Sequence, residues 1–206
     1  MFVYYRLMRI KDENKYNAIL EASIDLFKLE GFAKASISKI AKTAGVSPAT
    51  IYIYFENKED LINKLYLDVR AKMSKFVLEE INLDGCVEKE YKKMWINYYN
   101  FCLKFNKEFD YMMQFTNSPF GEKYNENLGL CYFSKVYELF RIGKENKVIK
   151  PVSDEILFAY TFYPSSQLAK RNLCSCSKLS ELYIYSARDI AWDAIKTNKT
   201  KSNCKG

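Results

Sequence analysis

Residues 36–54 read SISKIAKTAGVSPATIYIY, and this stretch decides the fold class of the amino-terminal part of the chain. Ser36 is a good N-cap for a short helix that would stop at Gly45. Ser47 is a second N-cap, and Pro48 suits the first position of the helix that follows. The pattern predicts two short helices joined by a tight turn, an arrangement that can place its second helix in the major groove of DNA.

The surface of this predicted unit carries charge of one sign. No aspartate or glutamate occurs between Gly31 and Phe55, whereas lysines do. Basic and hydroxyl side chains beside such a unit contact DNA phosphates, which position a protein without reading the base sequence. The candidates for this role are Lys34, Lys39, Lys42, Lys58 and the hydroxyl group of Ser36.

The second helix of the unit would present its side chains to the bases. Ile51 and Phe55 are four residues apart, so we expect them to face inward as core. The candidate DNA-reading residues are then Ser47, Ala49, Thr50, Tyr52, Ile53 and Tyr54. None of them is Arg, Lys, Asn or Gln, so this face lacks the paired hydrogen bonds that read guanine or adenine edges. Apolar contacts suit thymine methyl groups, which predicts an A·T-rich operator in double-stranded DNA.

Pattern alone leaves alternatives open. A Ser-Pro helix start and a glycine turn also fit an ordinary αα-hairpin in a helical bundle. Ahead of the first helix, Arg6, Arg9 and Lys11 form a basic arm that would reach a phosphate or the minor groove, or would be a solvated tail.

The composition of the whole chain limits the fold classes and functions that are compatible with it. The 206 residues are 49% hydrophobic, enough for a real core, and the net charge of +7 fits either a polyanionic partner or a mildly basic surface. Four prolines and seven glycines leave little room for β-turns, and apolar residues recur at helical spacing, so we expect an all-α protein. No stretch approaches the ~20 apolar residues of a membrane span, and the start lacks a signal-peptide pattern. We therefore expect a cytoplasmic protein whose six cysteines are reduced.

Helical spacing continues through the rest of the sequence. A first helix would end at Gly31, and a fourth helix at 58–81 would span ~36 Å, enough to link two lobes. Residues 82–86 give the clearest boundary in the middle of the chain. The later helices are expected at 87–105, 107–116, 121–144, 153–173 and 177–197.

The region after residue 86 is strongly aromatic. Aromatic side chains at helical spacing are usually core, but a pocket between bundle helices would be built from the same side chains. The candidate ligand-binding residues are Trp95, Tyr98, Tyr99, Tyr111, Phe115, Tyr132, Phe133 and Phe162. We expect an apolar or aromatic effector, and a cationic one is also compatible because tyrosine and tryptophan faces attract cations.

The last two helices are predicted to form a homodimer. They carry large apolar side chains with no obvious use inside one subunit, namely Tyr160, Tyr163, Leu168, Leu182, Tyr185, Ile190 and Trp192. A dimer would bring a second DNA-binding unit, with half-sites one helical turn or a multiple of it apart.

No metal, cofactor or catalytic centre is expected. Cys174 and Cys176 invite a metal or redox interpretation. The chain has no histidine and no second CxxC-type pair, so zinc is not supported, whereas a thiol sensor and two incidental cysteines both stay open. An enzyme with a helical fold is also poorly supported, because the chain has neither a glycine-rich phosphate loop nor a GxSxG motif.

Several of these segments together resemble the head of the TetR/AcrR family of bacterial repressors. The segments that carry the resemblance are 19–27, 31–32, 37–41, 44–52, 54–55 and 57–61, in unbroken order. The resemblance implies a nine-helix homodimer. Each subunit would hold a helix-turn-helix DNA-binding head at 1–57 and an effector-binding and dimerisation lobe at 58–200, linked through the fourth helix.

The resemblance also implies roles for single residues. Thr50, Tyr52 and Tyr54 fall where the family contacts operator DNA, and Lys58 falls where it touches a phosphate. Two departures are minor: Ser36 stands where threonine is frequent, and Ala49 stands where glycine is common. The implied function is a ligand-responsive repressor that releases its operator when an effector binds. An architectural DNA-binding protein of the same fold, without an effector, is the alternative.

Overall fold

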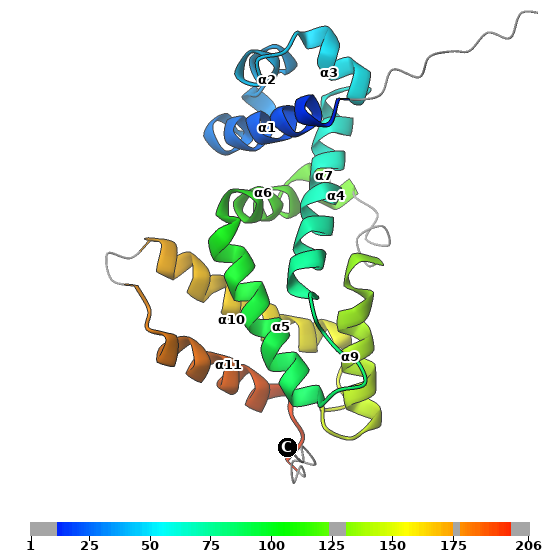
Figure 1. Cartoon of the computed structure of the whole chain (residues 1–206), viewed down its shortest axis with the longest axis vertical. Coiled ribbons are helices and arrows are strands. Elements are labelled where there is room, and N and C mark those ends of the chain that lie inside the picture. Colours follow the sequence, from blue (N-terminus) through cyan, green and yellow to red (C-terminus); the bar gives the residue numbers. More distant parts are fainter. Residues whose placement is uncertain (1–11, 124–130, 175–177, 199–206) are drawn as a thin grey trace, which may run out of the picture. The chain divides into compact units, whose positions relative to one another are not determined.

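The computed structural model describes residues 12–123, 131–174 and 178–198 (Figure 1). Within these ranges the regular elements are helices, and the β pairing is limited to an isolated bridge between Ile149 and Lys196. The prediction of an all-α fold is therefore confirmed. None of the described helices combines the length and the apolar character that crossing a bilayer would require.

The helices divide between two compact units, which we call the head and the lobe. The head consists of Met1–Tyr66 with Asp110–Glu122, and the lobe consists of Leu67–Phe109 with Lys123–Gly206. The elements are α1 (Glu13–Lys34), α2 (Ile37–Thr43), α3 (Pro48–Tyr54), α4 (Lys58–Val77), α5 (Val87–Lys104), α6 (Asn106–Thr116), α7 (Pro119–Lys123), the 3-10 helix η1 (Cys131–Phe133), α9 (Ser134–Glu145), α10 (Asp154–Cys174) and α11 (Glu181–Ile195). Both α4 and α6 contribute residues to the two units.

Two predicted helices differ from the observed ones. The single helix expected at 121–144 is wrong, because α7 begins at Pro119 and η1 and α9 follow as separate elements. Proline suits a helix start because the N–H that it lacks would have no partner there. Residues 124–130 lie outside the described part of the chain. The helix expected to reach about Ile81 ends at Val77, and Glu80 just beyond it has a positive φ of 58° that is incompatible with a helix.

The core of the head is built on one face of α1. Ile19, Ser23 and Phe27 follow one another at intervals of four residues and are buried, as the helical period predicts. The Ser23 hydroxyl donates to the Ile19 carbonyl at 2.6 Å, so this buried polar group is satisfied. The helix is interrupted at Gly31, whose φ of 76° suits glycine. The predicted break at this glycine is confirmed.

Two residues predicted to bind a ligand lie in the core of the head. Tyr111 and Phe115 lie on the part of α6 that is in the head, and both are buried. The Tyr111 hydroxyl donates to the Ile62 carbonyl at 2.6 Å, and the Phe115 ring stacks on Tyr66 with centroids 4.1 Å apart. Both contacts join α6 to α4 within the head, and a role of the two rings in ligand binding stays a prediction.

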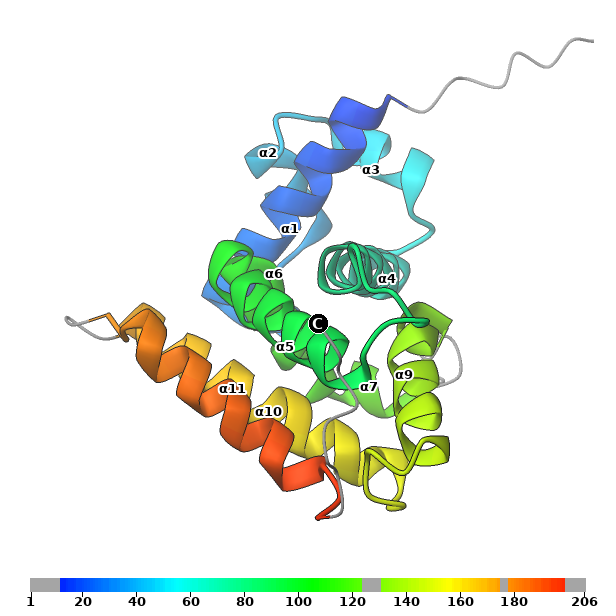
Figure 2. The same cartoon turned by 60° about the horizontal axis from the view of Figure 1, so that its bottom comes forward.

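In the lobe, α5 packs against α10 and α11 (Figures 1 and 2). The buried face of α10 carries small side chains at Thr161, Ser165 and Ala169, each four residues from the next. Larger rings fill the space beside this row. Tyr98 of α5 lies edge-on to Phe162 of α10 with ring centroids 4.7 Å apart, a favourable geometry for two aromatic rings.

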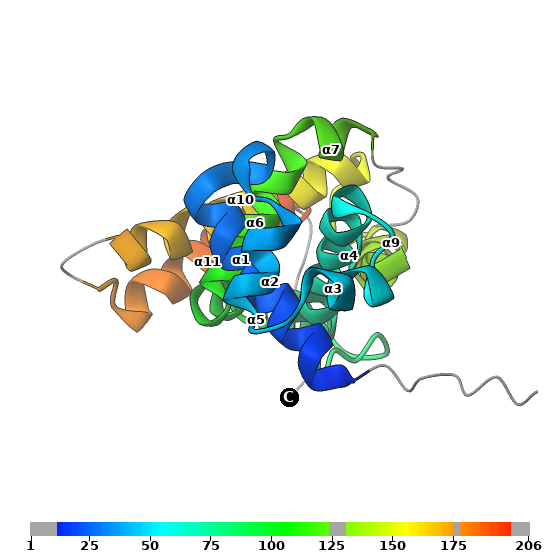
Figure 3. The ribbon, with the colours of Figure 1, turned by 90° about the horizontal axis from the view of Figure 1, so that it is seen from above.

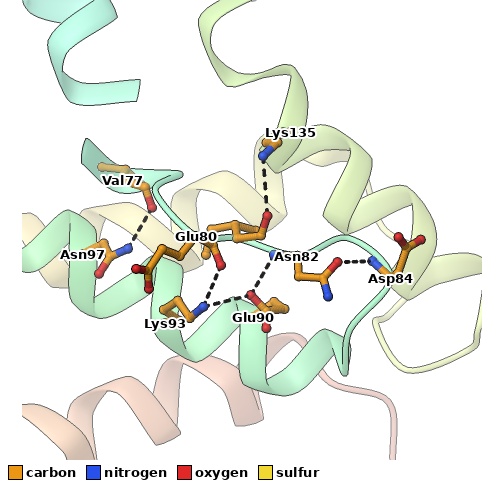
Figure 4. A network of polar contacts seen from close by, with 9 residues as sticks. Val77, Glu80, Asn82, Asp84, Glu90, Lys93, Asn97 and Lys135 are labelled. Atoms are coloured by element: carbon orange, nitrogen blue, oxygen red, sulfur yellow. Dashed lines mark hydrogen bonds and ion pairs between the residues drawn. The ribbon is translucent and has the colours of Figure 1, made fainter. Parts of the chain in front are cut away.

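The carboxyl end of α4 is held by side chains from two other helices of the lobe (Figure 4). Carbonyl groups at a helix end have no partner within the helix and need one elsewhere. The donors are Asn97 to the Val77 carbonyl at 3.1 Å, Lys93 to the Glu80 carbonyl at 2.6 Å and Lys135 to the Ile81 carbonyl at 3.4 Å. Side chains from α5 and α9 therefore hold the last residue of α4 and the loop residues that directly follow it.

A buried carboxylate fixes the loop between α4 and α5. Glu90 on α5 accepts a hydrogen bond from the backbone N–H of Asn82 at 3.0 Å, and Lys93 lies 3.6 Å from the same carboxylate (Figure 4). A buried charge is tolerated only when it is paired and hydrogen-bonded, and Glu90 meets both conditions. The loop is thus tied to the first turns of α5.

The cysteines only partly follow the prediction that all six are reduced thiols. Cys86 is disulfide-bonded, so the prediction is wrong for this residue. Cys102 is a free, buried thiol, and burial raises its pKa to about 12. Cys174 is free and exposed, whereas Cys176 lies outside the described residues.

Candidate nucleic-acid interface

The head contains the two short helices that the sequence predicts, and α2 packs against both α1 and α3 (Figure 3). The Ser36 hydroxyl accepts a hydrogen bond from the backbone N–H of Lys39 at 3.3 Å. The Ser47 hydroxyl accepts one from the backbone N–H of Thr50 at 3.1 Å. Both predicted N-caps are confirmed, and they fix the residue at which each helix begins.

The turn between α2 and α3 depends on Gly45. Its backbone N–H donates to the Lys42 carbonyl at 3.3 Å, and the N–H of Val46 donates to the Ala41 carbonyl at 2.9 Å. This pair of bonds ends a helix when the residue after the cap is left-handed, and Gly45 has a φ of 67°. A side chain would find open space here but would be strained by the backbone conformation.

Helix α3 separates its core face from an outer face as predicted. Ile51 and Phe55 are buried, whereas Tyr52 is 56% exposed and Ile53 is 45% exposed. Large apolar side chains at neighbouring exposed positions are unusual unless they contact something. Ala49 is exposed beside them, so α3 presents an apolar outer surface.

Thr50 contributes a hydroxyl group to this surface, and the sequence analysis predicts that it contacts the bases. Its hydroxyl lies 2.9 Å from the Ser47 hydroxyl and is half-buried. Because a hydroxyl group can donate one bond and accept two, this contact orients Thr50 and leaves its hydroxyl able to bond two further partners.

Tyr54 does not lie on the outer face where we expected it. Its side chain is 6% exposed, and its hydroxyl donates to the Asp12 carbonyl at 3.0 Å. Its ring also lies 5.8 Å from the Tyr16 ring. The expectation of an exposed reading residue was wrong, because the start of α1 provides both an aromatic surface and an acceptor for the phenol group.

The predicted phosphate-contacting lysines fall into two classes. Lys34 and Lys42 are exposed and have no carboxylate partner among the described residues. Lys39 instead forms an ion pair with Glu30, with 2.8 Å between Nζ and Oε2. Sequence reasoning missed this pair because Glu30 precedes the window that lacks acidic residues. Its spacing of nine residues, across two helices, gives no periodic signal.

Lys58 stands at the first position of α4 and is already bonded within the head. Its Nζ donates to the Ala33 carbonyl at 3.3 Å, and the side chain is half-buried. The start of α4 is capped by Asn57, whose side chain accepts from the backbone N–H of Asp60 at 2.9 Å. The Asp60 carboxylate in turn accepts from the backbone N–H of Glu56 at 2.9 Å, which completes a reciprocal cap.

Comparison with known proteins identifies both parts of the chain. Residues 19–65 match the model of the bacterial regulatory proteins of the tetR family, and residues 86–196 match the model of the tetracyclin repressor-like C-terminal domain. The second match alone covers more than half of the chain. The chain belongs to the TetR family. As a TetR-family protein it is a DNA-binding transcription regulator, and α2 with α3 is its helix-turn-helix.

Solved structures and curated relatives agree with the TetR assignment. A TetR family transcription regulator from Marinobacter aquaeolei VT8 is 30% identical with a TM-score of 0.81, covering 92% of this chain and 99% of that one. A putative TetR family regulator from Vibrio parahaemolyticus is 30% identical with a TM-score of 0.77, covering 89% and 99%. An HTH-type transcriptional regulator from Haemophilus influenzae is 24% identical over 86% of this chain and 94% of its own length.

A further relative matches this chain over only part of its length. The fatty acid metabolism regulator protein of Bacillus subtilis is 41% identical over 78 residues, which is 37% of this chain and 39% of the relative. TetR-family regulators bind operator DNA, usually as dimers, and the helix-turn-helix of this chain is built for the same contact.

The lobe of this TetR protein brings together most of the aromatic residues predicted to bind a ligand. Those with described side chains in the lobe are Trp95, Tyr98, Tyr99, Phe133 and Phe162, which are buried, and Tyr132, which is half-buried. The Trp95 ring stacks on Tyr99 with centroids 6.2 Å apart. The Phe133 and Phe162 rings are 6.5 Å apart. Tyr98, Phe162 and Phe133 are linked by ring contacts between α5, α10 and η1, and we call these three rings the aromatic region.

Sequence reasoning missed a cation within this aromatic region. The guanidinium carbon of Arg70 on α4 lies 4.6 Å from the centroid of the Phe133 ring, a distance typical of a cation–π contact. Arg70 was not singled out because it lies in a stretch of α4 rich in charged residues, where a solvated side chain is the usual expectation.

The apolar residues predicted for dimerisation are mostly exposed on α10 and α11. Exposed members of the set are Tyr160, Tyr163, Leu182, Tyr185 and Ile190, and Leu168 is half-buried. Trp192 is the exception, because it is buried and its ring centroid lies 5.1 Å from that of Tyr91 on α5. Its assignment to an exposed surface was wrong, since α5 covers it within the subunit.

Proposed function

We propose that this TetR-family regulator is a ligand-responsive repressor whose lobe binds a small effector and whose head then releases the operator. The observation that carries the proposal is the course of α4: Lys58 to Tyr66 belong to the head, and Leu67 to Val77 belong to the lobe. One continuous helix thus carries a predicted phosphate contact at its start and Arg70 of the aromatic region further along. We assign no catalytic activity to the chain. We propose a DNA-binding part at 1–57 and an effector part at 58–200, so that the effector part would include the segments of α4 and α6 that pack in the head.

The operator is proposed to be rich in A·T base pairs. The outer face of α3 offers Ala49, Thr50, Tyr52 and Ile53, among which there is no group that pairs with a guanine or adenine edge by two hydrogen bonds. Lys34 and Lys42 would add phosphate contacts that do not depend on sequence. Affinity would therefore depend strongly on salt and only modestly on each base pair.

The active form is proposed to be a homodimer that uses α10 and α11. Leu182 is 77% exposed and Ile190 is 69% exposed, and both lie on α11. Tyr160 and Tyr163 of α10 extend the apolar surface. A symmetric pairing of these helices would bury the surface twice and would give two heads for two half-sites ~34–36 Å apart or a multiple of that distance.

The effector is proposed to be apolar or aromatic, because the interior of the lobe is lined by rings. A cationic effector would also be attracted by tyrosine and tryptophan faces. The Bacillus subtilis relative is a fatty acid metabolism regulator, but that match covers too little of either chain to inform the lobe. A fatty acid is therefore one member of a test panel and has no preferred status.

The test is a fluorescence anisotropy titration of the purified protein on DNA from its own upstream region at fixed salt. Binding at low ionic strength, followed by release when one member of a panel of planar cations, fatty acids and flavonoid-like compounds is added, would support the proposal. Couplings of this kind usually change affinity about 5–150-fold. Binding that no compound weakens would favour the architectural DNA-binding protein without an effector. If the protein does not bind this DNA at all, the proposal that it contains the operator is refuted.

A further inference from the structure

The start of α1 is joined to the end of the helix that is proposed to read the DNA, α3 (Figures 1 and 3). The hydroxyl of Tyr54, the last residue of α3, donates to the Asp12 carbonyl at 3.0 Å. Asp12 is also the first residue that the structure describes. The chain that precedes Asp12 is therefore attached beside the carboxyl end of α3.

Aromatic contacts fix this junction independently of the hydrogen bond. The ring centroid of Tyr16, one turn after Asp12, lies 5.8 Å from that of Tyr54 and 5.6 Å from that of Phe55. Aromatic pairs at such distances stabilise a contact beyond the area that they bury. Lys64 on α4 also donates to the Tyr54 carbonyl at 3.3 Å. The first turn of α1 is thus held against α3 by a backbone acceptor and by two rings.

The carboxylate of Asp12 is used within α1. It accepts from the backbone N–H groups of Asn14 at 3.0 Å and Lys15 at 3.3 Å, and the side-chain nitrogen of Lys15 lies 3.5 Å from it. The neighbouring Glu13 is exposed, and its charge suits the first turn of a helix. This N-cap fixes the residue at which α1 begins and from which the preceding chain departs.

The preceding segment differs from the rest of the head in its basic residues. Residues 1–11 read MFVYYRLMRIK and lie outside the described residues, so only their sequence is used. They include Arg6, Arg9 and Lys11 but no aspartate or glutamate, and we call them the basic arm. Arg6 and Arg9 are the only arginines in the sequence before Arg70. Every other basic residue among the first 66 is a lysine.

Arginine and lysine differ in what they recognise on DNA. A lysine meets a phosphate as a point charge. Arginine is the side chain typically inserted into the narrow minor groove of A·T tracts, where the negative potential is strengthened. Terminal arms of several DNA-binding folds enter the minor groove in this way. Two arginines three residues apart therefore favour the minor groove as the partner of the basic arm.

The length of the basic arm allows this contact. A chain spans at most about 3.3–3.6 Å per residue, so Arg9 can lie up to about 11 Å from Asp12 and Arg6 up to about 22 Å. The major groove of B-DNA is about 12 Å wide and the minor groove about 6 Å. From the carboxyl end of a helix in the major groove, both arginines can therefore pass one sugar-phosphate backbone and reach the next minor groove.

We propose that the basic arm binds the minor groove next to the base pairs read by the carboxyl end of α3, with Arg6 and Arg9 inserted over A·T pairs. The proposal rests on the proposed placement of α3 in the major groove and is independent of release by an effector. The arm extends the recognised site by a flank that α3 does not reach. It also supplies arginine contacts, which α3 lacks.

The test varies the base pairs that flank the site enriched by positional selection with the full-length protein. A·T, G·C or inosine·cytosine pairs are placed on each side of the half-sites in turn. Inosine lacks the amino group of guanine, so an inosine·cytosine pair resembles A·T in the minor groove and G·C in the major groove. In anisotropy titrations we expect about 10-fold weaker binding with G·C flanks and nearly equal binding with the other two.

Arg6→Gln/Arg9→Gln should remove this difference between flanks, and an unchanged Tm shows that the variant is folded. Lys75→Gln/Lys147→Gln is the matched control, because it removes two positive charges from exposed positions of the lobe. The control should keep the full preference for A·T and inosine·cytosine flanks.

The side of the half-site that responds tests the attachment of the basic arm to α3. Ile53 lies near the carboxyl end of α3, whereas Thr50 lies near its start. The flank that responds should adjoin the base pairs whose preference changes in Ile53→Ala. A response only beside the pairs that change in Thr50→Ala would overturn the proposal.

Other results would overturn it as well. An equal loss of affinity on all three flanks in Arg6→Gln/Arg9→Gln would assign the basic arm to phosphates. Inosine·cytosine flanks that behave like G·C flanks would assign the readout to the major groove. Equal binding of the unmodified protein to all three flanks would show that the arm reads no bases.

The effector mechanism fails by different observations. Flank readout by a protein that no effector releases would count against the ligand-responsive repressor and leave the basic arm in the minor groove. Release by an effector without flank readout would do the reverse. Absence of any enriched site would overturn both proposals.

Discussion

The side-chain nitrogen of Lys39 lies 2.8 Å from a carboxylate oxygen of Glu30, so a lysine on the first helix of the helix-turn-helix carries an internal counter-ion. A phosphate that approached Lys39 would have to compete with this carboxylate. The pair therefore lowers the positive charge that the head offers to DNA.

Glu30→Gln should raise affinity for any duplex DNA by about 2–5-fold at low salt and make the dependence of affinity on salt steeper by up to about one unit. Stability should change little, because exposed ion pairs contribute only about 0–1 kcal/mol. Anisotropy titrations at several salt concentrations measure both quantities. Asp110→Asn is the matched control, because it removes the partner of Lys28 in the same head at 2.7 Å without affecting α2 or α3. An equal gain in the control would show that net charge alone is responsible.

Tyr52→Ala and Ile53→Ala should each weaken binding to the operator by about 5–10-fold, or roughly 1–1.4 kcal/mol, because each removes an exposed apolar contact from α3. Binding to unrelated DNA should be unchanged, since phosphate contacts remain. Leu29→Ala serves as a control, because Leu29 is 81% exposed on α1. Positional selection with the unmodified protein should enrich A·T-rich sites, and a G·C-rich consensus would refute the proposed readout.

Tyr54→Phe should destabilise the head and leave base preference unaltered. The substitution removes the hydrogen bond to the Asp12 carbonyl, which is worth about 0.5–1.5 kcal/mol, and Tm should fall by about 2–5 °C. A changed operator consensus with an unchanged Tm would instead place the phenol group against DNA. Thermal unfolding and positional selection together decide between the two.

Leu182→Glu should convert the protein to a monomer at micromolar concentration and reduce operator affinity more than tenfold, because it places a charge in the proposed apolar interface of α11. Sedimentation velocity measures the first effect and anisotropy the second. Leu29→Glu introduces the same charge at an exposed leucine of α1 and should leave the protein dimeric. If both variants are dimers, the proposal that α11 forms the dimer interface is refuted.

Stability should fall as pH rises above about 9. Burial raises the pKa of Cys102 from 9.0 to about 12 and raises the pKa of Tyr98 and Tyr111 above their usual value. The unfolded chain therefore releases protons at lower pH than the folded one, so the free energy of unfolding declines between pH 9 and 12. Each group contributes up to about 1.4 kcal/mol per pH unit within its own window. Urea midpoints measured at pH 7, 9 and 10 test this, and Cys102→Ala should reduce the slope by one proton.

Features set by neighbours in sequence were the ones that could be predicted. The caps at Ser36 and Ser47, the glycine turn and the inward face of α3 depend on residues within about one turn of each other, and all were found where expected. The period of the apolar residues likewise gave the long helices, because their buried faces repeat along each helix.

Features that depend on contacts between residues far apart in the sequence could not be predicted. The hydrogen-bond acceptor of the Tyr54 hydroxyl lies 42 residues earlier in the chain, and that of the Tyr111 hydroxyl lies 49 residues earlier. Neither contact leaves a pattern in the local sequence. A helical period shows that a face is buried but not which surface covers it. Trp192 was misplaced for the same reason, since its neighbour Tyr91 lies on a different helix. The contacts of the candidate DNA-binding and ligand-binding residues remain predictions.

The hydrogen bonds from Asn97, Lys93 and Lys135 to the carbonyl groups of Val77, Glu80 and Ile81, at the end of α4 and just beyond it, have a consequence for how that helix can move (Figure 4). A helix end with free carbonyl groups frays easily, whereas this end cannot unwind without breaking bonds to α5 and α9 as well. A ligand in the lobe would therefore move α4 as a rigid helix, without unfolding its last turn. Amide hydrogen exchange near Val77 should then stay slow whether or not the lobe is occupied.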